Sequence, residues 1–474
     1  MEMLFWSRSG VCSNNRLAHR HKRRIAWQGA GALAILCTLG AVGRAQDAPS
    51  GLSMRLDVTQ RLEFSDNPDF TVDGGSDFFG RTVLGFGLES VTNIERFTLN
   101  LGTDIEEGRT ERSSIDATNS FANLSYDRDT RNARLGVTAE YREADIDSTF
   151  FVEDFGIDGN VIDQDSGTRE TYRFGLEGAV GREAPIGASF SWNYTEISYS
   201  GTTDPDLTDQ SNSDFQAQVD FRITPRITTS LTGTYIDFDA QGNGTNRRTN
   251  GLGVSTELEI NPVTTADVGL SYDRIERSGD ETGVDEGVSV SFGLTRTMAN
   301  ASLGLRFSSD VTSNDNGRRS FLSVTRDVEL PRGALSVELG VTGADTIGSD
   351  PLVNISYRHQ LPTAALTFGV SQSVNTDNDN DEQINTSLRA GYDQQINSKS
   401  SYGVSATFLD RNDLSGTGDD GQRIDLSLNY RHDLTSDWGL VSGISHAFST
   451  EDNEEDRRRT TIFVGLQRSF NWLP

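Results

Sequence analysis

The sequence predicts an all-β fold, a transmembrane antiparallel up-and-down β-barrel of about 22 strands, within a range of about 18 to 24. Three observations predict it: short segments alternate apolar and polar residues, the connections between them alternate short and long, and a secretory signal precedes them. In the first segment Leu56 and Val58 share one parity, whereas Asp57 and Thr59 share the other. Since successive side chains of a strand point to opposite faces, each segment has one apolar and one polar face. Many such strands behind a secretory signal are typical of a barrel whose apolar face contacts lipid.

The first 45 residues have the organisation of a signal peptide, and residues 46–474 form the predicted outer-membrane barrel. A basic region ending at Arg24 precedes an apolar run over residues 29–42, which is too short for a stable membrane span. Residues 43–45 place small side chains at the two positions that a signal peptidase reads, so we expect cleavage after Ala45. Both cysteines, Cys12 and Cys37, fall in this segment, and the predicted mature chain has none.

The predicted mature chain is strongly acidic. Residues 1–45 hold seven of the 42 basic residues and one of the 70 acidic residues, which leaves 42 − 7 = 35 bases against 70 − 1 = 69 acids, a net charge of −34. Such a surface repels nucleic acid, so no nucleic-acid partner is expected. An acid-rich composition alone would indicate disorder, but the regular strand pattern argues against it.

Apolar residues of one parity recur along the whole chain, and no helical period of useful length is present. Each set predicts one strand with a lipid-facing side. Representative sets are Leu84, Phe86 and Leu88; Leu99 and Leu101; Leu135 and Val137; Phe190, Trp192 and Tyr194; Phe215 and Val219; Leu252 and Val254; Val290 and Phe292; and Leu426 and Leu428.

The connections between these segments alternate in length. Short turns fall at residues 92–95, 127–132, 181–185, 224–226, 261–264, 297–300 and 330–333. Longer acidic loops fall at residues 65–77, 106–116, 144–170, 200–211, 240–248, 277–285, 375–381, 410–422 and 449–458. In outer-membrane barrels short turns face the periplasm and long loops face outside, which predicts the Gram-negative outer membrane with both termini in the periplasm. A soluble all-β array is the alternative, and the loop asymmetry argues against it.

The polar parity of the strands is the predicted functional surface, because it lines the lumen of a barrel. Both signs of charge occur on it, and a lumen of this size and polarity should hold water. The net acidity predicts easier passage for cations and neutral polar solutes than for anions. The predicted lumen-lining residues are Arg55, Asp57, Arg61, Glu63, Asp104, Arg173, Glu177, Glu257, Glu259, Asp425 and Arg431.

One predicted loop is a candidate constriction. Residues 144–170 carry an apolar patch that includes Phe150, Phe151 and Phe155. A loop that folds inward can close a pore, and this loop is the candidate for such a constriction.

No catalytic, cofactor-binding or metal-binding residue is predicted, and no cofactor. A hydrolytic barrel needs a histidine at its outer rim together with a serine or paired carboxylates. Only His446 lies near a predicted outer strand end, with Ser442 and Asp452 close in sequence. Serine is abundant in this chain, so the grouping favours a girdle or lumen histidine over a rim enzyme.

Three predicted loops are rich in Asp, Asn and Gly, namely residues 279–287, 375–382 and 410–421. Oxygen ligands at this density can bind hard cations, but none of the three loops has a regular ligand spacing with a closing Glu. We interpret them as solvated loops. Weak divalent bridging to lipopolysaccharide phosphates is the alternative.

The opening of the mature chain, from Arg55 to Pro68, resembles the first strand and loop of β-barrel porins of proteobacteria, some of which are associated with exopolysaccharide systems. The last strand resembles the C-terminal signal by which outer-membrane proteins are recognised for assembly, and Gly465 and Phe470 carry that likeness. Arg468 stands where a bulky apolar residue is usual, and four residues follow the aromatic that normally ends the chain. No functional residue carries over from the resemblance.

These observations predict a porin-like channel for passive diffusion of small polar or cationic solutes. The alternative is a structural or export barrel that serves an envelope exopolysaccharide. The expected partners are outer-membrane lipid and lipopolysaccharide, the barrel assembly machinery and small solutes. A plugged transporter is not expected, because strands begin within about ten residues of the predicted cleavage site and leave no room for a globular domain between them. The solute and the oligomeric state stay open.

Overall fold

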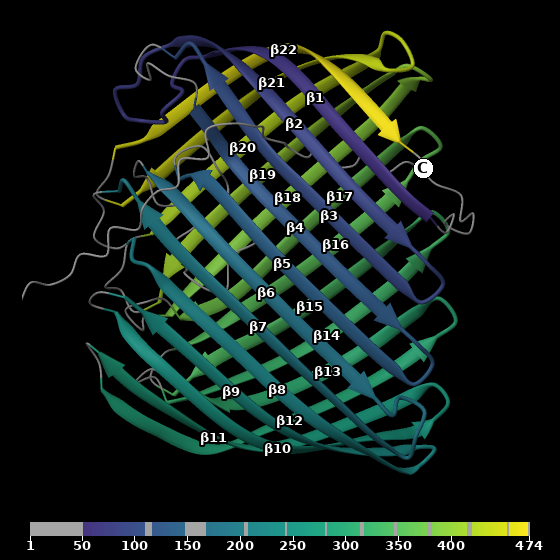
Figure 1. Ribbon diagram of the computed structural model, residues 1–474. Helices are drawn as coiled ribbons and strands as arrows, with labels where there is room; N and C mark the ends of the chain where they lie inside the picture. Colours follow the sequence, from purple (N-terminus) through teal and green to yellow (C-terminus); the bar gives the residue numbers. More distant parts are fainter. Residues whose placement is uncertain are drawn as a thin grey trace, which may run out of the picture. The chain divides into compact units, whose positions relative to one another are not determined.

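The computed structural model describes residues 51–109, 116–146, 167–202, 207–241, 244–279, 282–312, 317–345, 348–376, 382–414, 420–452 and 455–472. These residues are β-strands and their connections (Figure 1). Within them there is no helix that is both long enough and apolar enough to cross a membrane. The predicted signal peptide, residues 1–45, lies outside the described part of the chain.

The described residues form 22 strands. Their bounds are β1 (Gly51–Ser65), β2 (Asp77–Val91), β3 (Glu95–Glu107), β4 (Asp116–Asp129), β5 (Ala133–Asp145), β6 (Thr168–Val180), β7 (Ile186–Ser200), β8 (Gln210–Thr224), β9 (Ile227–Ala240), β10 (Thr245–Asn261), β11 (Thr264–Gly279), β12 (Gly283–Met298), β13 (Ala301–Val311), β14 (Arg318–Leu330), β15 (Gly333–Ala344), β16 (Ser349–Gln360), β17 (Ala364–Thr376), β18 (Glu382–Asn397), β19 (Ser400–Asp413), β20 (Gly421–Asp433), β21 (Trp438–Glu451) and β22 (Arg457–Trp472).

Each strand pairs antiparallel with the next one in the chain, and the first strand pairs with the last. The closing pairing runs from Met54 opposite Trp472 to Ser65 opposite Thr461. The sheet therefore has no free edge, which is how a β-structure satisfies its backbone groups in lipid. The predicted closed, antiparallel 22-stranded barrel is confirmed.

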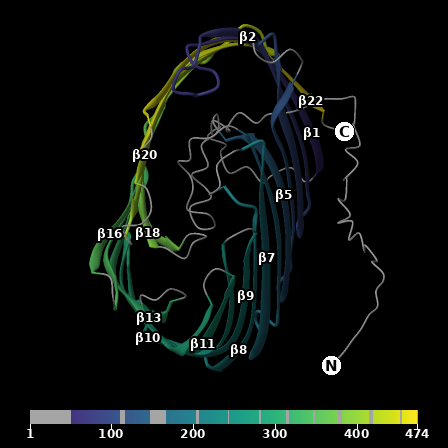
Figure 2. The same cartoon turned by 90° about the vertical axis from the view of Figure 1, so that its left-hand side faces the viewer.

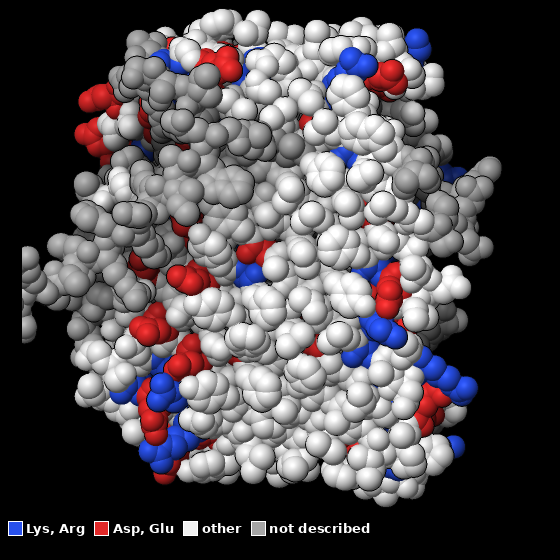
Figure 3. All heavy atoms as spheres, in the orientation of Figure 1, with Lys and Arg blue, Asp and Glu red and all other residues white. Residues whose placement is uncertain are grey.

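The two faces of the strands differ in chemistry, and β1 illustrates the difference. Leu62 and Phe64 are 50% and 45% exposed, whereas Thr59 and Glu63 on the other parity are 1% and 4% exposed. Apolar side chains are exposed in the same way on other strands, for example Leu252, Val254, Val268, Leu270, Leu426, Leu428, Ile462 and Val464. In Figure 3 charged side chains gather near the two ends of the strands, and the surface between them is mainly uncharged. An exposed apolar band of this kind is typical of a barrel surrounded by lipid.

The longest connections lie at one end of the strands, as predicted, but two connections predicted to be long, at residues 240–248 and 277–285, span only residues 241–244 and 280–282. Each even-numbered strand is joined to the next by a short connection, such as residues 92–94, 225–226 and 331–332. The long connections follow odd-numbered strands, and they include residues 66–76 and 146–167. We call the end with the long connections the loop end. In Figure 2 the β1–β2 connection, in purple, lies inside the ring of strands.

Candidate functional site

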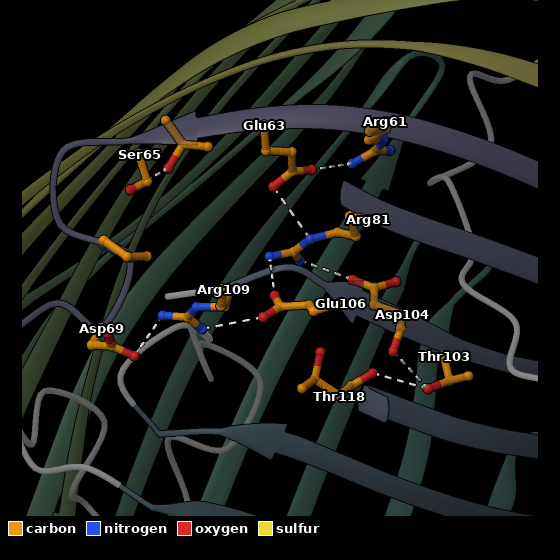
Figure 4. A network of polar contacts seen from close by, with 12 residues as sticks. Arg61, Glu63, Ser65, Asp69, Arg81, Thr103, Asp104, Glu106, Arg109 and Thr118 are labelled. Atoms are coloured by element: carbon orange, nitrogen blue, oxygen red, sulfur yellow. Dashed lines mark hydrogen bonds and ion pairs between the residues drawn. The ribbon is translucent and has the colours of Figure 1, made fainter. Parts of the chain in front are cut away.

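An ion-paired network lines the inner face of β1, β2 and β3 near the loop end, with Arg81 at its centre (Figure 4). The Nε of Arg81 lies 3.2 Å from Glu63, its Nη1 lies 3.1 Å from Asp104, and its Nη2 lies 2.5 Å from Glu106. One guanidinium from β2 thus contacts carboxylates on both neighbouring strands. Arginine suits this position, because its planar fork of donors can serve several carboxylates at once.

Strand register explains why these side chains meet. On the inner face Arg61 of β1 stands opposite Arg81 of β2, and Arg81 stands opposite Glu106 of β3. Two arginines directly opposite each other would repel. Glu63, two residues along β1, offsets this repulsion, because it lies 3.9 Å from Arg61 as well as 3.2 Å from Arg81.

The carboxylates of this network are buried. The side chains of Glu63 and Glu106 are each 5% exposed, and that of Asp104 is 12% exposed. A buried carboxylate is tolerated only when it is paired and hydrogen-bonded. The network therefore fixes the inner wall at this position.

The network continues from the strands into the connections of the loop end. Arg109, which follows β3, places its Nη1 3.1 Å from Glu106 and its Nη2 2.5 Å from Asp69 in the β1–β2 connection. The guanidinium of Arg109 is buried, with its side chain 7% exposed. The inner wall and the β1–β2 connection are therefore held together by one continuous set of ion pairs.

The β1–β2 connection also extends the seam where the barrel closes. The backbone NH of Asp66 donates to the carbonyl of Thr460 at 3.1 Å. The side-chain amide of Asn67 donates to the carbonyl oxygens of Thr71 at 2.6 Å and Arg458 at 2.9 Å. The bonds to Thr460 and Arg458 carry the contact with β22 beyond Ser65, where β1 ends.

Phe70 anchors this connection on the inner wall. It is 2% exposed, and its ring centroid lies 5.2 Å from the guanidinium carbon of Arg423 and 5.1 Å from that of Arg459. Arg423 is on β20 and Arg459 is on β22, each on the parity opposite to the lipid-facing residues of its strand. The aromatic ring of a loop residue thus lies within cation–π distance of two guanidinium groups of the strands.

All eleven predicted lumen-lining residues lie on strands, on the parity opposite to the exposed apolar side chains. Arg61, Glu63 and Asp104 belong to the network around Arg81. The others lie elsewhere on the wall. Arg55 contacts Asp57 at 2.7 Å, Arg173 contacts Glu140 at 3.3 Å, Glu177 contacts Arg134 at 2.8 Å, Asp425 contacts Arg423 at 3.0 Å, Arg431 contacts Asp433 at 3.1 Å, and Glu257 and Glu259 are on β10.

Sequence reasoning missed several residues of this site. Arg81 and Glu106 lie on the polar parity of their strands, so the signal that selected Arg61 would also have found them. Phe70 and Arg109 lie in connections, where side-chain parity carries no information. The predicted constriction residues Phe150, Phe151 and Phe155 lie outside the described residues.

A shallow concavity of about 340 Å³ lies on the inner face of β3 to β7. The ion pair between Arg173 and Glu140 lies in it, and Gly175 keeps it open, since a Cβ there would lie 2.4 Å from the Thr138 hydroxyl. Amide, hydroxyl and ion-paired groups therefore present a surface suited to a hydrogen-bonded polar solute. Its inner-face lining includes Asn100, Asn123, Thr138, Glu140, Arg173, Asn193 and Thr195.

The described part of the chain contains no group of three or more His, Cys, Asp and Glu residues placed to hold a metal ion. His446, the histidine weighed as a rim catalyst, has its Nδ1 3.1 Å from the hydroxyl of Thr460.

No protein-family model matches the chain, and no curated protein matches it. Solved structures with a similar barrel include a mutant of the ferric enterobactin receptor PfeA from Pseudomonas aeruginosa in complex with enterobactin, with a TM-score of 0.53 and 10% identity over 90% of this chain and 82% of that one. The ferric-catecholate import receptor Fiu from E. coli K12 gives a TM-score of 0.53 and 10% identity over 87% and 81%. The siderophore receptor PirA from Acinetobacter baumannii gives a TM-score of 0.50 and 8% identity over 90% and 81%. At these identities the likeness shows the fold alone, a closed antiparallel β-barrel.

The comparisons contradict the function predicted from the sequence. The prediction was a porin-like channel for passive diffusion of small polar or cationic solutes, whereas these similar barrels are siderophore receptors, neither porins nor enzymes. The alternative, a structural or export barrel for an exopolysaccharide, finds no support in them either. The prediction was wrong because strand alternation and loop length report how a barrel is built, and passive and ligand-binding barrels share both features.

Proposed function

We propose that the protein is an outer-membrane transport receptor, which binds one class of small solute inside its barrel and admits that solute selectively. The barrel has 22 strands. Barrels of about 16 to 18 strands are typical of open porins, whereas about 22 strands is the size found in outer-membrane transporters. The receptors similar to this barrel bind or import iron-carrying ligands such as ferric enterobactin and ferric catecholates, and we extend ligand binding, as a proposal, to this chain.

The observation that carries the proposal is the position of the β1–β2 connection inside the barrel. Asp69 pairs with Arg109, Asn67 bonds to the backbone of Arg458, and Phe70 packs on Arg423 and Arg459. A receptor needs polar and aromatic groups placed where a ligand can meet them. Fixed ion pairs and an inward connection favour the receptor.

The proposal includes an orientation. In this orientation residues 1–45 are a cleaved signal peptide, the short connections face the periplasm and the loop end faces outside. Outer-membrane lipid, lipopolysaccharide and the barrel assembly machinery are the expected partners. The predicted lumen-lining residues then lie along the path of the solute, and the concavity on β3 to β7 adds hydrogen-bonding groups to that path.

Two measurements on the purified, folded full chain test this function. The first is a liposome-swelling assay with neutral sugars of increasing mass. A diffusion pore gives swelling that decreases gradually as the sugar mass rises, and a receptor should not give this pattern. Ferric enterobactin, added to the same preparation, should then quench the intrinsic tryptophan fluorescence saturably. Swelling that depends on sugar mass in the manner of a diffusion pore would reject the proposal, and the same liposomes without protein are the control.

A further inference from the structure

We propose that Arg423 and Arg459 form a clamp for a planar aromatic anion, and that Phe70 occupies this clamp when the ligand is absent. The inference rests on the proposed receptor function, because the anion would be the solute or a part of it. It names the ligand class and one position at which the ligand is recognised.

The geometry of the clamp comes from two fixed strands and one connection. Arg423 on β20 and Arg459 on β22 are separated by a single strand, β21, and both face the interior. Their guanidinium carbons lie 5.2 Å and 5.1 Å from the centroid of the Phe70 ring. Both distances are within the range of about 6 Å in which a cation is attracted to the face of an aromatic ring. The space that the phenyl ring fills therefore has the size and the electrostatics for a ligand's aromatic ring.

The backbone that presents Phe70 is strained. Its φ is +52°, in the left-handed region that residues with a Cβ rarely adopt. Asn67 holds this conformation, because its carbonyl accepts from the NH of Phe70 at 3.2 Å and its side-chain oxygen accepts from the NH of Thr71 at 3.1 Å. Release of Phe70 from the clamp would relieve this backbone strain. The strain therefore reduces the free-energy difference between the state with Phe70 in the clamp and the state with Phe70 released, which burial of the ring alone would make larger.

A negatively charged group on the ligand is inferred from a hydrogen bond that is lost when the β1–β2 connection moves. The Nη1 of Arg459 donates to the carbonyl oxygen of Pro68 at 3.4 Å. When the β1–β2 connection moves, this acceptor moves together with Phe70. A carboxylate or catecholate oxygen attached to the incoming ring can take its place, and a charged acceptor bonds to a guanidinium more strongly than a carbonyl does. Arg423 meanwhile stays in position through its 3.0 Å contact with Asp425.

Other pairs of arginine and aromatic residues on the inner wall show why Phe70 is the exchangeable member. The guanidinium of Arg247 lies 4.3 Å from the ring of Phe238, and that of Arg61 lies 4.6 Å from the ring of Phe463. In both pairs the aromatic residue belongs to a strand, so its ring cannot leave without disturbing the sheet. Phe70 belongs to a connection, and a connection can move while every strand stays paired.

The test compares benzoate with cyclohexanecarboxylate, which have the same charge and nearly the same size but differ in aromaticity. Binding of each to the folded full chain is measured by isothermal titration calorimetry, with Phe70→Ala as the variant that vacates the clamp. We expect Phe70→Ala to bind benzoate about tenfold more tightly than the wild type, because the competing ring is gone. We also expect benzoate to bind this variant more tightly than cyclohexanecarboxylate does. Phe64→Ala, which removes a lipid-facing ring instead, should leave benzoate binding unchanged.

Second variants separate the clamp from a general effect on folding. Arg459→Gln and Arg423→Gln, each added to Phe70→Ala, should remove the preference for benzoate. Phe70→Leu keeps an apolar anchor in the connection and should bind benzoate with an affinity between those of the wild type and Phe70→Ala, so the test survives if the alanine variant fails to fold. Equal affinity for benzoate in the wild type and both Phe70 variants, or equal affinity for the two anions, would overturn the clamp. The proposed receptor function would still hold after such results if ferric enterobactin binds. Swelling that depends on sugar mass would reject the receptor function regardless of the benzoate measurements.

Discussion

Arg109 and Asp69 form an ion pair of 2.5 Å between Nη2 and Oδ1, although they belong to two different connections of the barrel. Arg109 follows β3, and Asp69 lies between β1 and β2. Because Arg109 also contacts Glu106 at 3.1 Å, the β1–β2 connection is linked through it to the inner wall. Movement of that connection must break or stretch this pair. The loop end of the barrel is therefore held by charge as well as by the packing of Phe70.

The first prediction concerns the centre of the network. Arg81→Met keeps much of the side-chain volume but removes the ion pair of Asp104 and weakens those of Glu63 and Glu106. Breaking a buried ion pair leaves a charge uncompensated, so we expect the free energy of unfolding to fall by about 3–5 kcal/mol. Urea titration of the barrel in lipid vesicles measures the loss.

The matched control for this prediction is Arg96→Met. Arg96 lies 3.7 Å from Glu89 in an exposed pair, with side chains 57% and 49% exposed. Exposed ion pairs contribute about 0–1 kcal/mol, so this variant should unfold nearly as the wild type does. Similar losses for Arg81→Met and Arg96→Met would contradict the structural role of the network.

The strands were predictable from the sequence because the information that specifies them is local. Leu426 and Ser427 are neighbours on opposite faces, and alternation alone assigns one to lipid and the other to the interior. The network was not predictable in this way. Arg81 meets Glu63, Asp104 and Glu106 only because three strands pair in one register, and no local pattern gives that register.

Phe70 shows the other limit of sequence reasoning. In the sequence it is a single aromatic residue in a polar connection, and nothing local distinguishes it from a solvated loop residue. Its partners Arg423 and Arg459 lie at the other end of the chain and meet it only after β1 and β22 pair. The function was mispredicted for a related reason. The class of barrel depends on what fills the interior, and the strand pattern does not specify the interior contacts.

The second prediction tests the two faces of a strand. Leu426 in the middle of β20 is 45% exposed among other apolar residues of the outer band. Leu426→Arg places a charge toward the lipid and should lower the free energy of unfolding by about 2–4 kcal/mol if the position is near the bilayer midplane. Ser427→Arg places the same charge inside the barrel, at the cost of one hydrogen bond of 2.6 Å to Ser405. Urea titration of each variant in lipid vesicles measures the change in the free energy of unfolding, and equal losses would show that the faces are assigned wrongly.

The third prediction concerns the seam between β1 and β22. Gly465 stands opposite Arg61, and a Cβ at Gly465 would lie 2.4 Å from the backbone carbonyl oxygen of Gln60. Gly465→Ala must push the closing strands apart, and overpacking of this kind costs about 1–3 kcal/mol. Urea titration measures this loss. Gly233→Ala is the control, since a Cβ there meets no heavy atom within 4 Å, and a change within about 0.5 kcal/mol is expected. If Gly465→Ala is as stable as Gly233→Ala, then β1 and β22 leave more space at Gly465 than their register implies.

The last prediction concerns orientation in the membrane. The predicted mature chain has no cysteine, so a single introduced cysteine reports one position without background. Gly75 lies in the β1–β2 connection at the loop end, where a Cβ meets no heavy atom within 4 Å, and Asn93 lies exposed in the short β2–β3 connection at the opposite end. If the loop end faces outside, a membrane-impermeant maleimide should label Gly75→Cys on intact cells. The same reagent should label Asn93→Cys only after the outer membrane is permeabilised. Permeabilised cells of both variants serve as the control for reactivity, and labelling of Asn93→Cys alone on intact cells would reverse the proposed orientation.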